Sequence, residues 1–137
     1  MPLSGGCHCG AVRYEIDGAT VAQAICHCSD CRRNAGAPFV AWGMLPEAAV
    51  RVTQGAGQLT TYRSSEHAVR QFCKVCGAGL FYRNAVNLPG LIDVQTATLD
   101  DPEALAPTVQ VQAAEKLVWV DRLGEMPAFP RFPNQDD

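Results

Sequence analysis

The sequence predicts a mainly β protein in which groups of cysteines hold metal ions. Short stretches of alternating apolar and polar residues follow one another at close intervals, and glycine or proline residues separate them. No stretch keeps a helical period over three turns, and the seven cysteines form short-spaced groups. Because 47% of the 137 residues are hydrophobic, the chain can bury a core, and we expect a single domain over residues 1–137.

The clearest predicted strand is residues 11–17 (AVRYEID). Val12, Tyr14 and Ile16 alternate there with charged residues, which is the pattern of a strand with one buried face. Further short apolar segments are predicted to be strands, and along the chain these are residues 21–26, 38–45, 50–54, 59–65, 68–73, 79–83, 91–97, 109–112 and 116–120.

Short helical turns are expected at residues 29–35, with Ser29 as the N-cap, and at residues 102–105. The tail PAFPRFPNQDD is too rich in proline and polar residues to form a regular element. We expect it to pack Phe129 and Phe132 over the surface.

The composition argues against several classes of partner. A net charge of −3 and a pI near 5.5 leave no broad basic surface for nucleic acid or an anionic membrane. The first residues lack the basic and apolar regions of a signal peptide, and no apolar run is long enough to cross a bilayer. We therefore expect a cytoplasmic protein. In that reducing compartment, closely spaced cysteines favour metal binding or redox chemistry over a disulfide framework, which is the alternative.

Two cysteine pairs that lie far apart in the sequence can form one four-ligand site. Cys7 and Cys9 are two positions apart, so on an extended backbone both thiols point to the same side. Cys73 and Cys76 have the spacing of a zinc knuckle, which is a tight turn. Such a turn commonly ends in a residue with positive φ, and Gly77 suits that position. We expect these four cysteines to hold a structural zinc that closes a long loop and contributes to folding.

Cys26, Cys28 and Cys31 form the remaining group, in the segment CHCSDCRR. The first two share a side of an extended segment, and a turn can bring the third sulfur to them. A catalytic zinc typically has three protein ligands and leaves the fourth position to water or substrate. The three thiols therefore predict an open, catalytic zinc site.

The neighbours of these three cysteines allow more than one interpretation. His27 points away from the thiols in this geometry, and we expect it to be packed or solvent-facing rather than a ligand. If Ser29 caps a helix, Cys31 lies in the first turn, where backbone N–H groups favour the thiolate. Arg32 and Arg33 either balance the charge of a three-thiolate zinc, bind a substrate carboxylate, or lie in an ordinary solvated turn.

Four segments of the chain carry a resemblance to a known family. In order they are GCHCGAVRYEI, CHCSDCRRNAGAPF, VRQFCKVCGAGLFY and EKLVWVDRLGEMPAF. Together they resemble the signature blocks of the glutathione-dependent formaldehyde-activating enzyme family, over nearly the whole chain. The succession CxC, CxCxxC, CxxC is far more specific than a single CxxC.

The resemblance implies a fold, two zinc sites and an activity. The fold is a β-tent of short antiparallel sheets. The family's first CxC and last CxxC hold a structural zinc, and its CxCxxC holds a second zinc taken to be catalytic; both match the groups described above. The implied enzyme is a carbon–sulfur lyase that forms or cleaves the adduct of glutathione with formaldehyde or another aldehyde, such as S-hydroxymethylglutathione. Zinc would hold the thiol as thiolate or polarise the hydroxyl oxygen of the adduct.

Two other function classes stay open at this stage. One is a non-enzymatic, zinc-stabilised binding module, although the chain has no basic extension or long disordered arm for such binding. The other is a thiol redox sensor that uses Cys26, Cys28 and Cys31. Gln110 stands near the place where many family members have a histidine, which indicates a different polar contact. No residue of the sequence stands out as the general acid or base.

Overall fold

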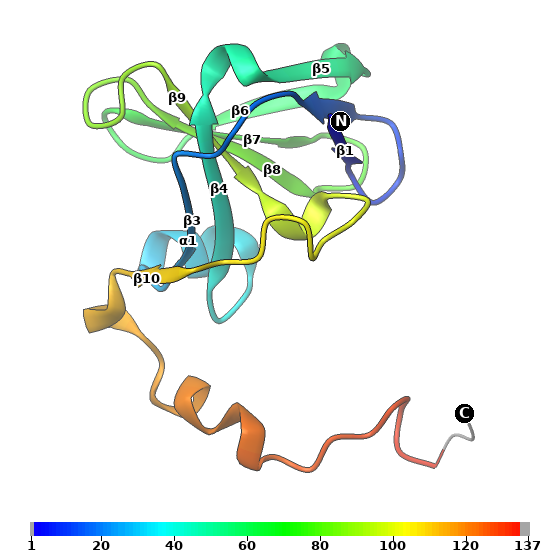
Figure 1. The fold of residues 1–137 in the computed structure, drawn as a ribbon, viewed down its shortest axis with the longest axis vertical. Coiled ribbons are helices and arrows are strands. Elements are labelled where there is room, and N and C mark those ends of the chain that lie inside the picture. The colour runs from blue at the N-terminus through cyan, green and yellow to red at the C-terminus, as the bar shows by residue number, and fades with distance from the viewer. Residues whose placement is uncertain (1, 135–137) are drawn as a thin grey trace.

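The computed structural model describes residues 2–134, and the mainly β prediction is confirmed (Figure 1). The smaller of its two sheets has three strands in the order β1-β2-β5, and neighbouring strands are antiparallel. Its strands are β1 (Leu3–Gly6), β2 (Arg13–Ile16) and β5 (Val50–Gln54).

The larger sheet has seven strands in the order β10-β3-β4-β9-β8-β7-β6. Its neighbouring strands are antiparallel except at one edge, where β10 runs parallel to β3. The strands are β3 (Ala22–Cys26), β4 (Val40–Pro46), β6 (Leu59–Arg63), β7 (Ala68–Cys73), β8 (Gly79–Asn84), β9 (Leu91–Gln95) and β10 (Val109–Val111).

The main core lies between the two sheets. Tyr14 of β2 is fully buried, and its ring meets the ring of Phe81 of β8 edge to face, with centroids 5.3 Å apart. The Tyr14 hydroxyl and the Thr98 hydroxyl are hydrogen bonded at 2.7 Å, so the buried oxygen keeps a partner. The larger sheet supplies most of the other buried side chains, among them Leu45, Leu80, Ile92 and Val94.

The α-helix α1 (Ser29–Ala35) follows β3 directly, as the sequence predicts. Its N-cap, however, is Cys28 rather than Ser29, because the Cys28 sulfur accepts a hydrogen bond from the backbone N–H of Cys31. Gly36 ends the helix in the left-handed region. Short 3-10 helices also occur, and η1 (Glu47–Ala49), η2 (Ala56–Gln58) and η3 (Thr96–Thr98) lie between strands. The other two, η4 (Ala113–Glu115) and η5 (Val118–Glu125), follow β10.

Two strand assignments made from the sequence differ from the structure. Residues 116–120 are not a strand, because the chain there leaves the sheet edge and enters η5. Strand β1 was missed because its sequence, LSGG, has low β propensity. Gly5 is nevertheless required in β1, since a Cβ at this position would lie 2.4 Å from the Tyr14 hydroxyl oxygen. Residues 102–105 form a turn, as expected.

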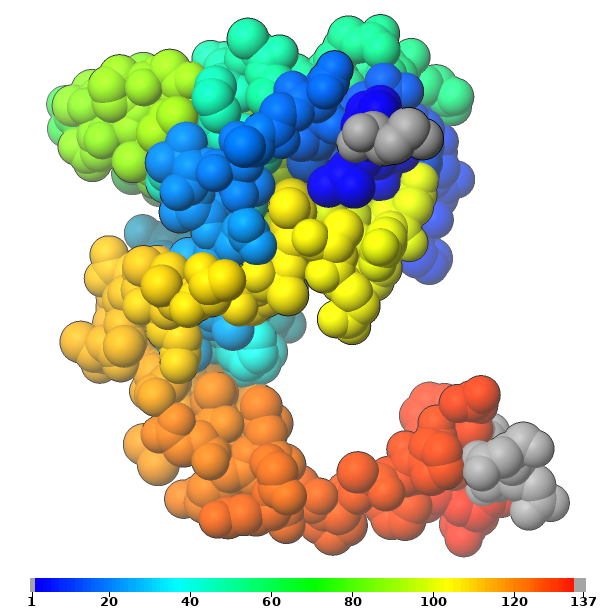
Figure 2. Space-filling model, viewed as in Figure 1, coloured from blue at the N-terminus to red at the C-terminus, as the bar shows by residue number. Residues whose placement is uncertain are grey.

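The chain beyond η4 leads away from the sheets and forms an arm, drawn from orange to red in Figures 1 and 2. The expectation that Phe129 and Phe132 pack over the surface is wrong, since they are 60% and 77% exposed. Prolines at 127, 130 and 133 deprive the arm of N–H donors that a regular element would need. The last three residues of the predicted tail lie outside the described part. Within that part, no helix is long and apolar enough to span a membrane.

The core contact suggests a stability test. Tyr14→Ala should lower the free energy of unfolding by about 3–5 kcal/mol, because it leaves a large cavity between the sheets. Tyr14→Phe keeps the ring and should cost about 1 kcal/mol for the lost hydrogen bond. Tyr62→Ala, at a tyrosine that is 53% exposed, is the matched control and should cost less than about 0.5 kcal/mol. Urea unfolding measures all three, and equal losses at positions 14 and 62 would contradict the assignment of the core.

Candidate active site and metal centres

The first cysteine group joins the two sheets. The sulfur atoms of Cys7, Cys9, Cys73 and Cys76 all lie within 4.8 Å of one another. Cys7 and Cys9 follow β1 of the small sheet, whereas Cys73 ends β7 of the large one. The segment around Cys7 is a turn and not the extended backbone expected from the sequence, since the Gly10 N–H donates to the Cys7 carbonyl at 3.2 Å.

The second half of this group is a matching turn. The Gly77 N–H donates to the Cys73 carbonyl at 2.8 Å, and Gly77 has a φ of 83°, as Gly10 does. The N–H of Ala78 and further hydrogen bonds lower the pKa of Cys76 to about 6. Each turn therefore presents two sulfurs and ends in a glycine that tolerates positive φ.

The sulfur positions in this group can be compared with those of a tetrahedral metal site. Four sulfurs that each lie about 2.3 Å from a central zinc are separated from one another by about 3.8 Å. The Cys7 and Cys9 sulfurs are 3.7 Å apart, and the Cys9 and Cys73 sulfurs are 3.9 Å apart. These two separations match the expected value, so the group could hold a metal ion of this kind.

The second cysteine group lies where β3 passes into α1. The sulfurs of Cys26, Cys28 and Cys31 are also within 4.8 Å of one another. Cys26 ends β3, Cys28 caps the helix and Cys31 is buried in its first turn, so one short segment positions all three. Among the described residues, no fourth cysteine, histidine or carboxylate joins this group.

Arg70 of β7 is the cation that faces this group, and the sequence did not single it out. Its guanidinium nitrogens lie 3.7 and 3.8 Å from the Cys31 sulfur, and the side chain is buried. The guanidinium also lies over the ring of Tyr82, 4.9 Å from the centroid. Hydrogen bonds from Cys26, Cys28 and Arg70 lower the pKa of Cys31 to about 5, although burial opposes this.

In the described chain, the three residues that the sequence placed beside these cysteines do not contact the sulfur atoms in any hydrogen bond. Arg32 donates to the His27 carbonyl at 3.2 Å, and Arg33 is exposed. His27 is packed, as expected, because only 1% of it is exposed and its ring lies against Phe39. Its Nε2 is 2.7 Å from the Gln110 side-chain oxygen, so Gln110 contacts this histidine.

A cavity of about 430 Å³ opens beside the three cysteines. Its floor is a row of side chains across the larger sheet, in which Met44 pairs with Asp93, Asp93 with Tyr82, and Tyr82 with Arg70. Directly paired residues point to the same face of a sheet, so these four side chains share the face that carries the cavity. Trp42 is buried in the same wall, and Val111, Gln112 and Glu115 form the outer side.

Asp93 is a second residue that the sequence reading missed. It is only 8% exposed, and its carboxyl group makes no hydrogen bond or ion pair with any residue of the described chain. Burial and the negative charge of Cys31 raise its pKa to about 7. A charged residue between the buried Ile92 and Val94 is the signal that could have identified it, because an unpaired buried charge is costly.

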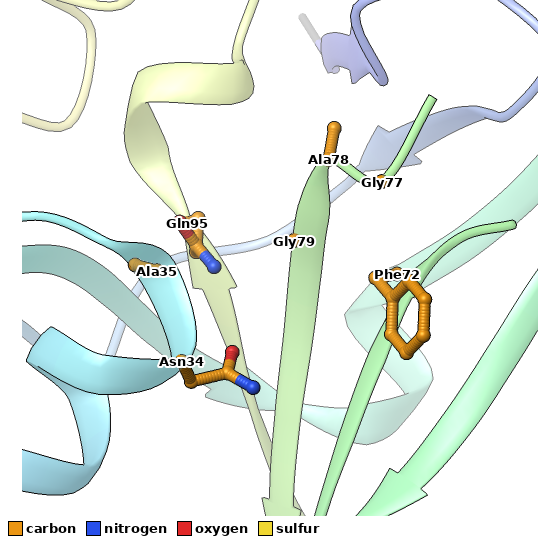
Figure 3. A pocket seen from close by; sticks show the side chains of 7 residues that line it. All are labelled: Asn34, Ala35, Phe72, Gly77, Ala78, Gly79 and Gln95. Atoms are coloured by element: carbon orange, nitrogen blue, oxygen red, sulfur yellow. The ribbon is translucent and has the colours of Figure 1, made fainter. Parts of the chain in front are cut away.

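A neighbouring cavity of about 310 Å³ lies between the end of α1 and the Cys73–Cys76 turn (Figure 3). Among the residues that line this cavity, only Asn34 of α1 and Gln95 of β9 have polar side chains. No thiol or titratable group lines this cavity. Of these two cavities, only the one beside Cys31 is lined by thiols and titratable groups.

The fold and the cysteine groups together define a class: a small, mainly β protein with two cysteine clusters that could hold metal ions, one of them open to a cavity. Residues 2–115 match the family described as glutathione-dependent formaldehyde-activating enzyme. The chain belongs to this family.

Individual relatives agree with this assignment. A Halomonas elongata protein named "Putative glutathione-dependent formaldehyde-activating enzyme" is 28% identical over 128 residues, which cover 88% of this chain and 81% of that protein. An uncharacterized lyase of Schizosaccharomyces pombe is 32% identical over 83 residues, 60% of this chain but only 58% of that protein. A crystal structure of a Rhodobacter sphaeroides protein superposes with a TM-score of 0.65 and 28% identity, covering 79% of this chain and 99% of that one.

The raised pKa of Asp93 predicts a pH dependence of stability. Unfolded aspartate has a pKa of about 3.9, so between that value and about 7 the folded state binds more protons, and stability falls as the pH rises. Asp93→Asn removes this loss and should therefore gain stability relative to the wild type between pH 4 and pH 8, by at most about 4 kcal/mol.

Urea unfolding across this pH range measures the effect, and the exposed Asp17→Asn controls for the loss of one negative charge. A difference between wild type and Asp93→Asn that stays constant from pH 4 to pH 8 would show that Asp93 is not destabilised by ionisation in the folded protein.

Proposed function

We propose that the protein is a zinc-dependent carbon–sulfur lyase or synthase that acts on a thiol–aldehyde adduct such as S-hydroxymethylglutathione. The observation that carries the proposal is the group of three sulfurs, without a fourth protein ligand in the described chain, that opens into a cavity. Such a group suits a catalytic metal, since the fourth position is then free for substrate. Membership of the family supports glutathione as the thiol and formaldehyde or another aldehyde as the carbonyl partner.

The ligands indicate which metal the two groups would bind. Thiolates select soft or borderline metals, and tetrahedral sulfur sites of this size are typical of zinc. The proposed structural ion is held by Cys7, Cys9, Cys73 and Cys76, and the proposed catalytic ion by Cys26, Cys28 and Cys31. Zinc bound at the second group would keep a substrate thiol deprotonated or polarise the adduct hydroxyl.

The remaining residues of the cavity have separate roles in this proposal. Arg70 balances part of the negative charge that three thiolates bring, because its guanidinium reaches the Cys31 sulfur. Trp42 and Tyr82 form an aromatic wall that limits water around the reacting carbon. The exposed outer side, at Gln112 and Glu115, leaves an entrance for a peptide thiol.

Metal content tests the two proposed sites. Protein purified without chelator should contain about two zinc ions per chain, and Cys31→Ser should keep about one and a native fold. Cys26, Cys28 and Cys31 lie in one short segment and close no long loop, so the loss of their metal releases little chain entropy. Cys73→Ser should instead lower the melting temperature and solubility, because it opens the link between the sheets. A zinc-free, fully reduced native protein would favour a thiol sensor over the lyase.

Turnover tests the reaction. The wild type should accelerate formation and cleavage of glutathione adducts with at least one member of an aldehyde panel, above the spontaneous rate, and Cys31→Ser should lose this acceleration. Glutathione should also change the visible spectrum of the cobalt-substituted protein, because an incoming sulfur alters the ligand field. A spectrum that no thiol or adduct perturbs, together with no turnover, would favour a non-enzymatic binding module.

A further inference from the structure

The proposed reaction requires a proton to move at the oxygen of the adduct. Cleavage of a hemithioacetal turns a hydroxyl group into a carbonyl group, so a base must take the hydroxyl proton; in the reverse direction an acid must return it. The three cysteines cannot serve if they hold a metal, because ligating thiols are deprotonated and committed to the ion. The proton acceptor must come from the rest of the cavity.

The contacts of the other cavity residues exclude most of them. Arg70 cannot deprotonate, and it is already held by the Cys31 sulfur and by the Ser64 hydroxyl at 3.2 Å. The Tyr82 hydroxyl accepts from the Asn84 amide at 3.4 Å. Glu115 is exposed and accepts from the backbone N–H of Ser29 at 3.2 Å, and Asp30 is exposed at the mouth.

Asp93 differs from all of these. Its side chain lies on the cavity floor between Met44 and Tyr82, more than nine-tenths of it is buried, and its carboxyl has no partner in the described chain. A buried, unpartnered carboxyl group is costly, and stability alone does not account for it. Its two oxygens are therefore available to accept a hydrogen bond from a ligand in the cavity or, when protonated, to donate one.

We propose that Asp93 is the general acid and base of the reaction and acts on the oxygen of the thiol–aldehyde adduct. This role rests on the proposed lyase function. In cleavage, the Asp93 carboxylate takes the hydroxyl proton, the oxygen electron pair forms the carbonyl bond, and the carbon–sulfur bond breaks with its electrons staying on sulfur. In synthesis, the thiolate attacks the carbonyl carbon, and the Asp93 carboxylic acid donates its proton to the oxygen. No electron leaves or enters the reactants in either direction.

The surroundings of Asp93 suit a group that must exist in both protonation states. Burial raises the pKa of Asp93 above the ordinary value for aspartate, so its carboxylic acid form persists to higher pH than that of an exposed aspartate. The titratable and charged side chains that face it across the cavity come from β3, α1, β7, β8 and η4, and they are Cys26, Cys28, Asp30, Cys31, Arg70, Tyr82 and Glu115.

The test compares Asp93→Asn with the wild type, both as full-length, zinc-loaded protein. The rates of adduct formation and cleavage are followed from pH 5 to pH 9 with glutathione and the aldehyde that the wild type uses best. Asp93→Asn should lower both rates by about 100-fold or more and remove one ionisation from the pH profile. Asp30→Asn and Glu115→Gln should retain that ionisation. Zinc content and the cobalt spectrum of Asp93→Asn should match those of the wild type.

A readout that does not depend on turnover accompanies the kinetics. The carboxyl carbon of Asp93, observed by NMR in protein labelled at aspartate, should titrate well above the ordinary aspartate pKa of about 3.9, because the carboxyl group is buried. Its signal is assigned by its absence from Asp93→Asn. Saturating glutathione adduct should shift this titration, because the hydroxyl of the adduct reaches the carboxyl group.

The outcomes separate the two proposals. An active wild type together with an Asp93→Asn protein of unchanged rate and pH profile overturns the role of Asp93 and leaves the lyase standing. If Asp30→Asn or Glu115→Gln loses the ionisation from its pH profile, the acid–base role belongs to that residue and not to Asp93. If Asp93→Asn loses zinc, Asp93 is a structural residue. A wild type that accelerates no adduct of the panel overturns the lyase function and, with it, the acid–base role.

Discussion

The alternation of side chains along β4, β8 and β9 is the constraint on which the rest of the structure depends. Leu45, Phe81, Ile92 and Val94 belong to the core cluster that also contains Tyr14 of the smaller sheet. The residues between them must then point the other way. That second face receives α1 and the three cysteines, so packing the core on one side also aligns the polar row of Asp93, Tyr82 and Arg70 under the thiols on the other. Core and cavity share the same strands and cannot be shifted independently.

The two cysteine groups have the same chemistry but different places in the chain. Cys7 and Cys9 meet Cys73 and Cys76 across more than sixty positions, so a metal there would constrain a large part of the unfolded ensemble. Cys26, Cys28 and Cys31 lie within six positions, and a metal held by them would constrain almost nothing. A metal at the first group would therefore act as a cross-link that serves folding, whereas a metal at the second would be free to exchange its fourth ligand.

Much of the fold and of both cysteine groups could be predicted because their signals are local. Strand 11–17 shows its alternation directly, and spacing alone groups the thiols. What the sequence could not reveal depends on long-range pairing. Arg70 reaches Cys31 only because β7, β8 and β9 pair in one register, and the sequence drew attention instead to the adjacent Arg32 and Arg33. Strand β1 forms because Gly5 fits against the buried Tyr14, and the β propensity of a single residue does not include such a contact.

The short edge strand β10 has a further consequence. It pairs with β3 through only three residues, and the segment that follows bends back at Gln112, whose φ is 54°, to form the outer side of the cavity. None of these residues belongs to the core. Substitutions or insertions here therefore reshape the entrance at little cost in folding free energy. A fold of this kind can diversify the molecules it admits while its cysteine groups and core stay constant, and redesign of the substrate range would begin at this edge.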